Sequence, residues 1–291
     1  MNHKKIAILV ITLILVLLFV TACAATKESD SQPFPELKEW DLLFVSSSTN
    51  WGVGQYYAKL IEDDMKVKVN LHDCWVGGLD IGVALKNLQN EWSWNSYVDD
   101  HSCYRPLADL IKEAEVMVLF GGPFASAPAD GSWKIPESWA SCIHGGYAGK
   151  NMQPEFETYI DKMQNSCAPE TWDTYKSDLG AFLDEIDKIR EGRPLILRMT
   201  TAYTPLHSRW TKSGVDDVCT QCTSYIVEVI HQVAEVHNVP VADTMVGLNG
   251  NDYKSEIPKE YIGKDGIHPS EAGAQFIASL LQQTGYAYAG K

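Results

Sequence analysis

Short apolar runs alternate with helix-like segments along most of this chain. Runs of four to five residues rich in Val, Leu, Ile and Phe are typical of strands that are buried on both faces. Strands separated by helices are joined by right-handed crossovers, so their sheet is parallel. The predicted strands cover residues 42–45, 67–71, 116–120, 195–199 and 239–242, and the predicted helices cover about 53–63, 81–89, 106–114, 171–190, 217–237 and the segment after Pro269. The sequence therefore predicts one α/β domain, a three-layer α/β/α sandwich around a five-stranded parallel sheet.

The N-terminus has the organisation of a secretory signal. Lys4 and Lys5 precede an apolar run at residues 6–20, in which Thr12 is the one polar residue, and small residues lead to Cys23. A basic start, an apolar run of this length and small residues before a cleavage point are typical of such signals. The apolar run is also shorter than the roughly 20 residues that a spanning helix needs. A Cys at this point resembles the lipobox of bacterial lipoproteins, which implies cleavage before Cys23 and lipid attachment to its sulfur.

These features divide the chain into three parts. We expect a signal peptide over 1–22, a lipidated Cys with a flexible tether over 23–39, and the folded domain over 40–291. The domain would then lie outside the cytoplasm, tethered to a membrane, and an uncleaved N-terminal anchor is the alternative. The tether is rich in Ser, Lys, Glu and Pro, as flexible linkers are.

The charge of the chain argues against one class of partner. The formal net charge is -14 at pH 7, and removal of Lys4 and Lys5 with the signal makes it about -16. Nucleic-acid binding depends on basic surfaces, so nucleic acid is not an expected partner. Acidity of this size also disfavours polyanionic substrates. No obligate protein partner is evident from the sequence.

Six cysteines remain in the predicted domain, an even number that indicates disulfides in an exported chain. They are Cys74, Cys103, Cys142, Cys167, Cys219 and Cys222. Six cysteines allow fifteen pairings, and proximity along the chain favours 74 with 103, 142 with 167 and 219 with 222. A zinc site at Cys219 and Cys222 is the alternative, although no second Cys or His pair has matching spacing.

An Asp stands three residues before a His near the C-terminus. Asp265 and His268 lie on a predicted tight turn, and Pro269 leads into an amphipathic helix. At this spacing the carboxylate can hold one ring nitrogen while the other faces a cleft, which is the geometry of a general base. The alternative is a helix entry at which the Asp only caps the turn.

A run of hydroxyl side chains follows the first predicted strand. Ser46, Ser47 and Ser48 stand where that strand ends and a helix begins. Capping of the helix is the commonest use of such residues. In a parallel sheet, however, ligands bind at the carboxyl ends of the strands, so the order Ser, Asp, His predicts a hydrolytic triad at one edge of the sheet.

With these residues the domain resembles the SGNH or GDSL-type hydrolases. Ser48 with Gly52 matches the spacing of the first block of that family, Gly78 fits the second, and Asp265 with His268 matches the last. The resemblance implies a flavodoxin-like three-layer fold, a Ser48–Asp265–His268 triad, and an oxyanion hole made by the backbone N–H groups of Ser48 and Gly78. It implies no metal or organic cofactor.

The chain departs from the pattern of the family at two blocks. Ser46 and Ser47 stand where the family has Gly and Asp, and Gly122 stands where the third block has an Asn that donates to the oxyanion. Loss of one oxyanion donor costs about 2.7 to 4 kcal/mol in transition-state stabilisation. Candidates for a substitute lie in the long stretch 123–168 and are Asn151, Gln153 and Asn165.

Two functions of different class follow. The first is a membrane-tethered serine esterase that acts on carboxylic esters, with carbohydrate O-acetyl groups and short acyl esters as the expected substrates. The second is a surface lipoprotein that keeps the hydrolase fold but binds a glycan or another ligand without turnover. Trp133, Trp139 and Tyr147 would form an aromatic wall for such a ligand, or else the small core of their own loop.

Overall fold

The computed structural model describes residues 39–76, 79, 81–89, 105–120, 122, 142, 167 and 169–289. The predicted signal peptide and tether, including Cys23, lie outside these residues, so their assignment stays a prediction. Among the described residues, none of the helices is both long enough and apolar enough to cross a membrane.

A five-stranded sheet forms the centre of the domain. Its strands are β1 (Glu39–Ser47), β2 (Lys68–Val76), β3 (Val116–Phe120), β4 (Ile196–Thr200) and β5 (Val241–Ala242). They lie in the order β2-β1-β3-β4-β5, and every pair is parallel. The predicted parallel α/β architecture is therefore confirmed.

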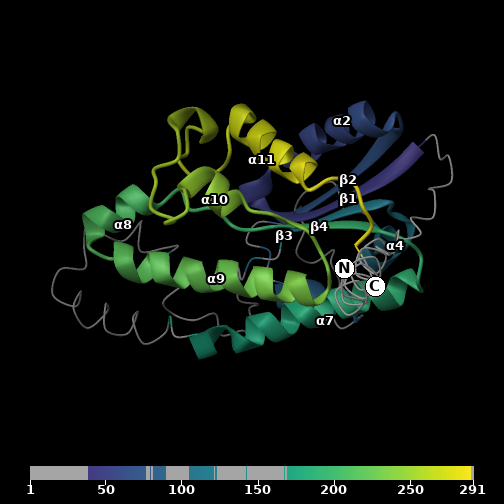
Figure 1. Cartoon of the computed structure of the whole chain (residues 1–291), viewed down its shortest axis with the longest axis horizontal. Helices are drawn as coiled ribbons and strands as arrows, with labels where there is room; N and C mark the ends of the chain where they lie inside the picture. Colours follow the sequence, from purple (N-terminus) through teal and green to yellow (C-terminus); the bar gives the residue numbers. More distant parts are fainter. Residues whose placement is uncertain are drawn as a thin grey trace, which may run out of the picture. The chain divides into compact units, whose positions relative to one another are not determined.

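Helices cover both faces of the sheet. They are α2 (Val53–Met65), α3 (Ile81–Leu88), α4 (Leu107–Glu113), α7 (Asp173–Arg190), α8 (His207–Ser213), α9 (Asp216–Val236), α10 (Thr244–Asn249) and α11 (Glu271–Gln283). Figure 1 shows α2 and α11 side by side on one face, with α7 and α9 on the other. Single 3-10 turns, η1 (Ser48–Asn50), η3 (Pro169–Trp172) and η4 (Lys259–Tyr261), complete the described elements.

The central strands are buried on both sides. Leu43 and Val45 of β1 pack into the apolar cluster under α3, α7 and α9. Their neighbour Phe44 points to the other face, where it lies against Gly54 of α2. Burial on both faces explains why β1 and β3 read as continuous apolar runs rather than as alternating patterns.

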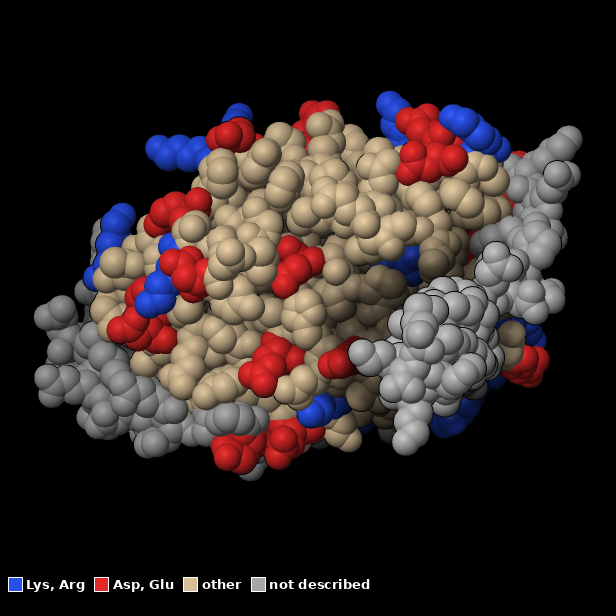
Figure 2. Space-filling model, in the orientation of Figure 1, with Lys and Arg blue, Asp and Glu red and all other residues tan. Residues whose placement is uncertain are grey.

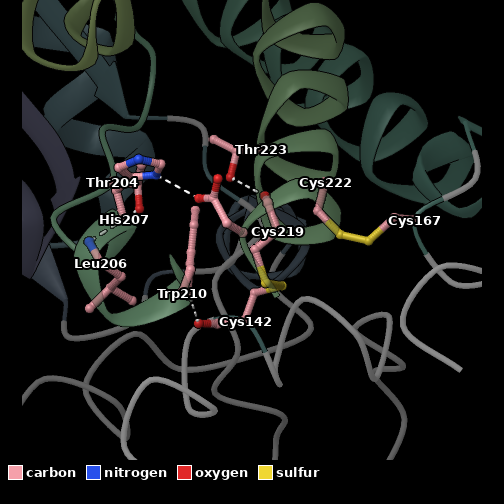
Figure 3. Close-up of a disulfide and its surroundings, with 10 residues drawn as sticks. Cys142, Cys167, Thr204, Leu206, His207, Trp210, Cys219, Cys222 and Thr223 are labelled. Atoms are coloured by element: carbon pink, nitrogen blue, oxygen red, sulfur yellow. Dashed lines mark hydrogen bonds and ion pairs between the residues drawn. A yellow bond between two sulfur atoms is a disulfide. The ribbon is translucent and has the colours of Figure 1, made fainter. Parts of the chain in front are cut away.

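Two disulfides attach the stretch 123–168 to α9. Cys142 pairs with Cys219 and Cys167 pairs with Cys222, with Cα atoms 5.6 and 5.0 Å apart (Figure 3). The predicted pairings 142 with 167 and 219 with 222 are therefore wrong. The physical reason is that both cysteines of α9 lie on its buried side, where each meets a different cysteine from earlier in the chain.

The zinc alternative is also wrong, because both of its cysteine ligands are used in these disulfides. Cys74 is disulfide-bonded as well. Cys103 lies outside the described residues, so its pairing with Cys74 stays a prediction. On the chain-entropy account, closing the loop of 77 residues between Cys142 and Cys219 stabilises the fold by about 4.5 kcal/mol.

A buried arginine fixes the C-terminal residues to the sheet. Arg198 of β4 is completely buried and donates to the carbonyl oxygens of Gly285 and Ala287, each at 2.8 Å. Its Nε donates to Thr284 Oγ1 at 2.8 Å. The contacts hold the residues that follow α11 against β4, and so they help to fix the position of that helix.

Asp73 of β2 gives the fold a pH-dependent weak point. Its Oδ1 is buried without a hydrogen-bond partner among the described residues, and burial raises the pKa of this carboxyl from 3.8 to about 6. Because the folded state then holds the proton more tightly than the unfolded chain, stability from this group is present below pH 4 and is lost as pH rises through 6.

Asp73→Asn should therefore stabilise the protein at neutral pH. Relative to wild type, its free energy of unfolding should gain about 2 to 3 kcal/mol between pH 4 and pH 7. Urea unfolding of both proteins at several pH values, with disulfides intact, measures this difference. The exposed Asp63→Asn is the control and should show no such trend, and a pH-independent difference for Asp73→Asn would contradict the prediction.

Candidate active site

Asp265 and His268 form a direct pair on the turn before α11. His268 Nδ1 lies 2.6 Å from Asp265 Oδ2. The other carboxylate oxygen, Oδ1, accepts from the backbone N–H groups of Ile267 at 2.9 Å and His268 at 3.0 Å. Gly266, which follows Asp265 in this turn, has a φ of +73°, a backbone conformation that favours glycine. One oxygen thus shapes the turn while the other binds the imidazole, so the capping role and the catalytic role are compatible.

Asp265 is ionised over the whole working range of pH. Burial alone would raise its pKa, but the hydrogen bonds from the Ile267 N–H, the His268 ring and the His268 N–H outweigh it and lower the pKa to about 2. A carboxylate only accepts hydrogen bonds, so His268 Nδ1 carries the proton. The other ring nitrogen, Nε2, is then free to act as a base.

The segment around this pair is tightly held. Ser270 caps α11 by accepting from the Gly273 N–H at 3.2 Å, and the Gly263 N–H donates to His268 O at 2.8 Å. A Cβ at Gly273 would overlap the carbonyl group of Tyr261, with the carbonyl carbon only 2.9 Å away. Only glycine allows this close approach of helix and turn.

Tyr203 supports the same turn from the loop after β4. Its side chain is buried, and its hydroxyl donates to Ile267 O at 3.0 Å. Burial and the neighbouring Asp265 carboxylate raise the pKa of this phenol, so it stays a donor. The sequence pattern did not indicate this role, because it depends on a contact between residues 64 positions apart.

Ser47 and Ser48, at the end of β1, make different contacts. Ser47 is buried and caps η1, since its Oγ accepts from the Thr49 N–H at 3.4 Å and lies 2.7 Å from Thr49 Oγ1. Ser48 is half-buried, and its hydroxyl has no hydrogen-bond partner within the described residues. The capping role considered for these serines therefore falls to Ser47 and leaves Ser48 free to act as a nucleophile.

The segment after β1 meets the turn before α11 beside His268. Trp51, which follows η1, lies edge-on to the imidazole with ring centroids 6.5 Å apart and planes at 88°. The backbone N–H of Trp51 donates to Ser48 O at 3.1 Å, so the turn that carries Ser48 lies close to His268. No hydrogen bond joins Ser48 Oγ to His268 in the described part of the chain. Catalytic contacts in ligand-free enzymes are often long and tighten when substrate binds.

The predicted oxyanion hole lies only partly within the described residues. Ser48 and Gly122 are described, and Gly122 is buried and offers no side-chain donor. Gly78 lies outside the described residues, as do the remaining residues considered for the site: Asn151, Gln153, Asn165, Trp133, Trp139 and Tyr147. Their predicted roles stay predictions.

Three other Asp–His pairs lie in the part of the domain that the structure describes. His231 is 2.9 Å from Asp243, His207 is 2.6 Å from Asp216, and His72 is 3.2 Å from Asp41. Asp243 Oδ2 contacts His231, while its Oδ1 accepts from the Thr201 hydroxyl at 3.0 Å. The His207 pair lies beside the Cys142–Cys219 disulfide (Figure 3). Among the described residues, no group of three or more His, Cys, Asp or Glu could hold a metal ion.

The charge around the domain is mixed. On the face shown in Figure 2, acidic side chains lie in several clusters interspersed with Lys and Arg. The described ion pairs are mostly of the exposed kind, such as Lys68–Glu39 at 3.0 Å and Arg105–Glu113 at 2.7 Å. Pairs of this kind contribute little to stability.

Comparison with known proteins gives structural matches. No protein-family model matches the chain, and no curated protein matches it. A lipase from goat rumen metagenome aligns over 85% of this chain and 98% of its own, with 16% identity and a TM-score of 0.54. A putative SGNH hydrolase from Slackia heliotrinireducens aligns over 84% and 98%, with 15% identity and a TM-score of 0.47. An acetyl xylan esterase from Geobacillus stearothermophilus aligns over 85% and 95%, with 14% identity and a TM-score of 0.47.

The match to the lipase covers 85% of this chain and 98% of the lipase chain. This chain therefore has the three-layer α/β fold of that lipase, which is the fold that its resemblance to the SGNH hydrolases predicts.

Proposed function

We propose that this protein is a serine esterase with Ser48 as nucleophile, His268 as general base and Asp265 as the group that orients the base. The observation that carries the proposal is the Asp265–His268 pair, 2.6 Å apart, beside the turn that presents Ser48 at the carboxyl end of β1. The fold shared with a lipase supports ester hydrolysis as the reaction class.

The mechanism follows from these groups. His268 Nε2 takes the proton of the Ser48 hydroxyl, and the Ser48 oxygen attacks the ester carbonyl carbon. Backbone N–H groups of Ser48 and Gly78 stabilise the oxyanion. The imidazolium, held by Asp265, then gives its proton to the leaving alcohol, and water releases the acyl group by the same steps in reverse order.

The substrate and the location complete the proposal. Carbohydrate O-acetyl groups and short acyl esters are the proposed substrates, and the enzyme would act outside the cytoplasm, held to a membrane by a lipid on Cys23. The disulfides at Cys219 and Cys222 support an oxidising compartment, because disulfides persist in such environments.

A second candidate is a surface lipoprotein that binds a glycan without turnover. Gly122 favours it, because the residue leaves the oxyanion without the Asn side chain found in the SGNH pattern. Weakened stabilisation of this size would slow an esterase roughly a hundred- to a thousandfold, but the nucleophile and base would remain.

Covalent labelling separates the two candidates. A fluorophosphonate should modify the wild-type protein, because the probe reacts with a serine activated by a base, and Ser48→Ala should abolish the labelling. Intact-protein mass spectrometry measures the adduct.

The matched control is Ser46→Ala, two positions earlier. Ser46 is fully buried and its Oγ has no hydrogen-bond partner in the described part of the chain, so this variant should label like wild type. Failure of the folded, disulfide-intact wild type to label would favour the binding protein instead.

A further inference from the structure

One large aromatic side chain next to the site is open to solvent. Trp51 is 59% exposed, and it is the only aromatic among the large exposed apolar residues of the described chain, which otherwise are Met65, Val236 and Val246. A solvent-exposed indole loses the free energy that burial of its surface would give. Its position beside His268 suggests that a ligand covers it.

The indole of Trp51 has an aromatic neighbour on β2. Its ring lies near that of Trp75, with centroids 6.2 Å apart and planes at 35°. Trp75 is half-buried near the end of β2, opposite Ser46 of β1 in the parallel register. The backbone N–H of Trp51 donates to Ser48 O at 3.1 Å, which fixes the main chain that carries the indole. The two indoles therefore form an aromatic surface at the carboxyl ends of β1 and β2.

The contact of Trp51 with the imidazole indicates which part of a substrate would reach it. Its ring meets His268 edge-on at a centroid distance of 6.5 Å. In acyl transfer, the imidazole gives its proton to the oxygen of the leaving alcohol. The alcohol part of the ester must therefore pass beside His268, where Trp51 is its neighbour.

We propose that Trp51 and Trp75 form a platform for the alcohol part of the substrate, and that this alcohol is a carbohydrate. The proposal rests on the proposed esterase function and names its substrate class. A flat, open aromatic face suits a sugar ring, which covers the indole with its apolar C–H face while its hydroxyl groups stay in water. A long acyl chain instead needs an enclosed apolar pocket. The acidic net charge of the chain, -14, agrees with a neutral alcohol.

The kinetic experiment compares two monoacetate esters that differ in the alcohol. Acetate release from 6-O-acetylglucose and from ethyl acetate is followed in a pH-stat for wild type and Trp51→Ala. We expect kcat/KM for the sugar ester to fall roughly tenfold, mainly through KM, because the platform binds ground state and transition state alike. The rate with ethyl acetate should stay within about twofold.

Two further variants serve as controls. Trp51→Phe keeps an aromatic face and should restore most of the affinity for the sugar ester. Val236→Ala removes an exposed apolar side chain at the far end of α9 (77% exposed) and should change neither rate. An equal fall for both esters in Trp51→Ala, or a fall that grows with acyl chain length in a series of ethyl esters, would overturn the proposal.

A binding experiment separates the platform from the proposed chemistry. Ser48→Ala and Ser48→Ala/Trp51→Ala are titrated with 6-O-acetylglucose, and binding is observed by ligand-detected NMR. Binding to the first protein and loss in the second supports the platform, even if wild type hydrolyses neither ester and the esterase function fails. Equal binding by both proteins, or no binding by either, refutes the platform whatever the outcome for hydrolysis.

Discussion

His268→Ala should lower kcat/KM for acetate esters by roughly 10^4- to 10^6-fold. The imidazole is the only base placed beside the Ser48 turn in the described residues, and a serine hydroxyl without a base is a weak nucleophile. Hydrolysis of p-nitrophenyl acetate, with the reaction in buffer subtracted, measures this effect.

His231→Ala is the matched control for this variant. His231 also contacts a carboxylate, Asp243, at 2.9 Å, but it lies on α9 away from the serine turn. Its replacement should leave activity within about twofold of wild type, provided that thermal unfolding shows the variant to be folded. If His268→Ala kept activity within tenfold of wild type, His268 would not be the base.

The fold was readable from the sequence because its central strands are buried on both faces. β1 and β3 are continuous apolar runs, and the helices between strands fix the parallel order. β2 was predicted to end at Leu71 but continues to Val76, because an edge strand carries polar residues such as His72 and Asp73. The short helices α8 and α10 were missed, since seven and six residues are too few to show helical periodicity.

Contacts of the candidate site within one turn were predicted from the sequence, whereas contacts between distant segments were not. The Asp265–His268 pair follows from a spacing of three residues within one turn, which a sequence displays directly. The disulfides of α9 join distant segments, so proximity along the chain gave the wrong cysteine pairings. The contact of Tyr203 with the turn before α11 also joins distant segments, and the sequence did not indicate it. Trp51 was missed because exposure of an aromatic side chain depends on what the fold leaves uncovered.

Asp265→Asn should lower kcat/KM by about 10^4-fold, as the equivalent change does in chymotrypsin-like serine proteases, while changing stability little. The amide oxygen can still accept from the Ile267 and His268 N–H groups, so the turn keeps its shape. The amide NH2, however, is a donor and faces Nδ1, which then becomes the acceptor. The ring proton moves to Nε2, and His268 can no longer take the proton of Ser48.

Stability and pH distinguish this effect from loss of structure. The lowered pKa of Asp265, about 2, means that its carboxylate stabilises the fold above pH 4, and that this contribution is lost as pH falls toward 2. The side chain is half exposed, at 49%, so solvent screens the contribution, and the melting temperature of Asp265→Asn at pH 7 should lie close to that of wild type. Asp265→Ala also removes the acceptor of the turn and should lower both activity and melting temperature. If Asp265→Asn retained wild-type activity, the carboxylate would serve only the turn, and the orientation of His268 would have to come from elsewhere.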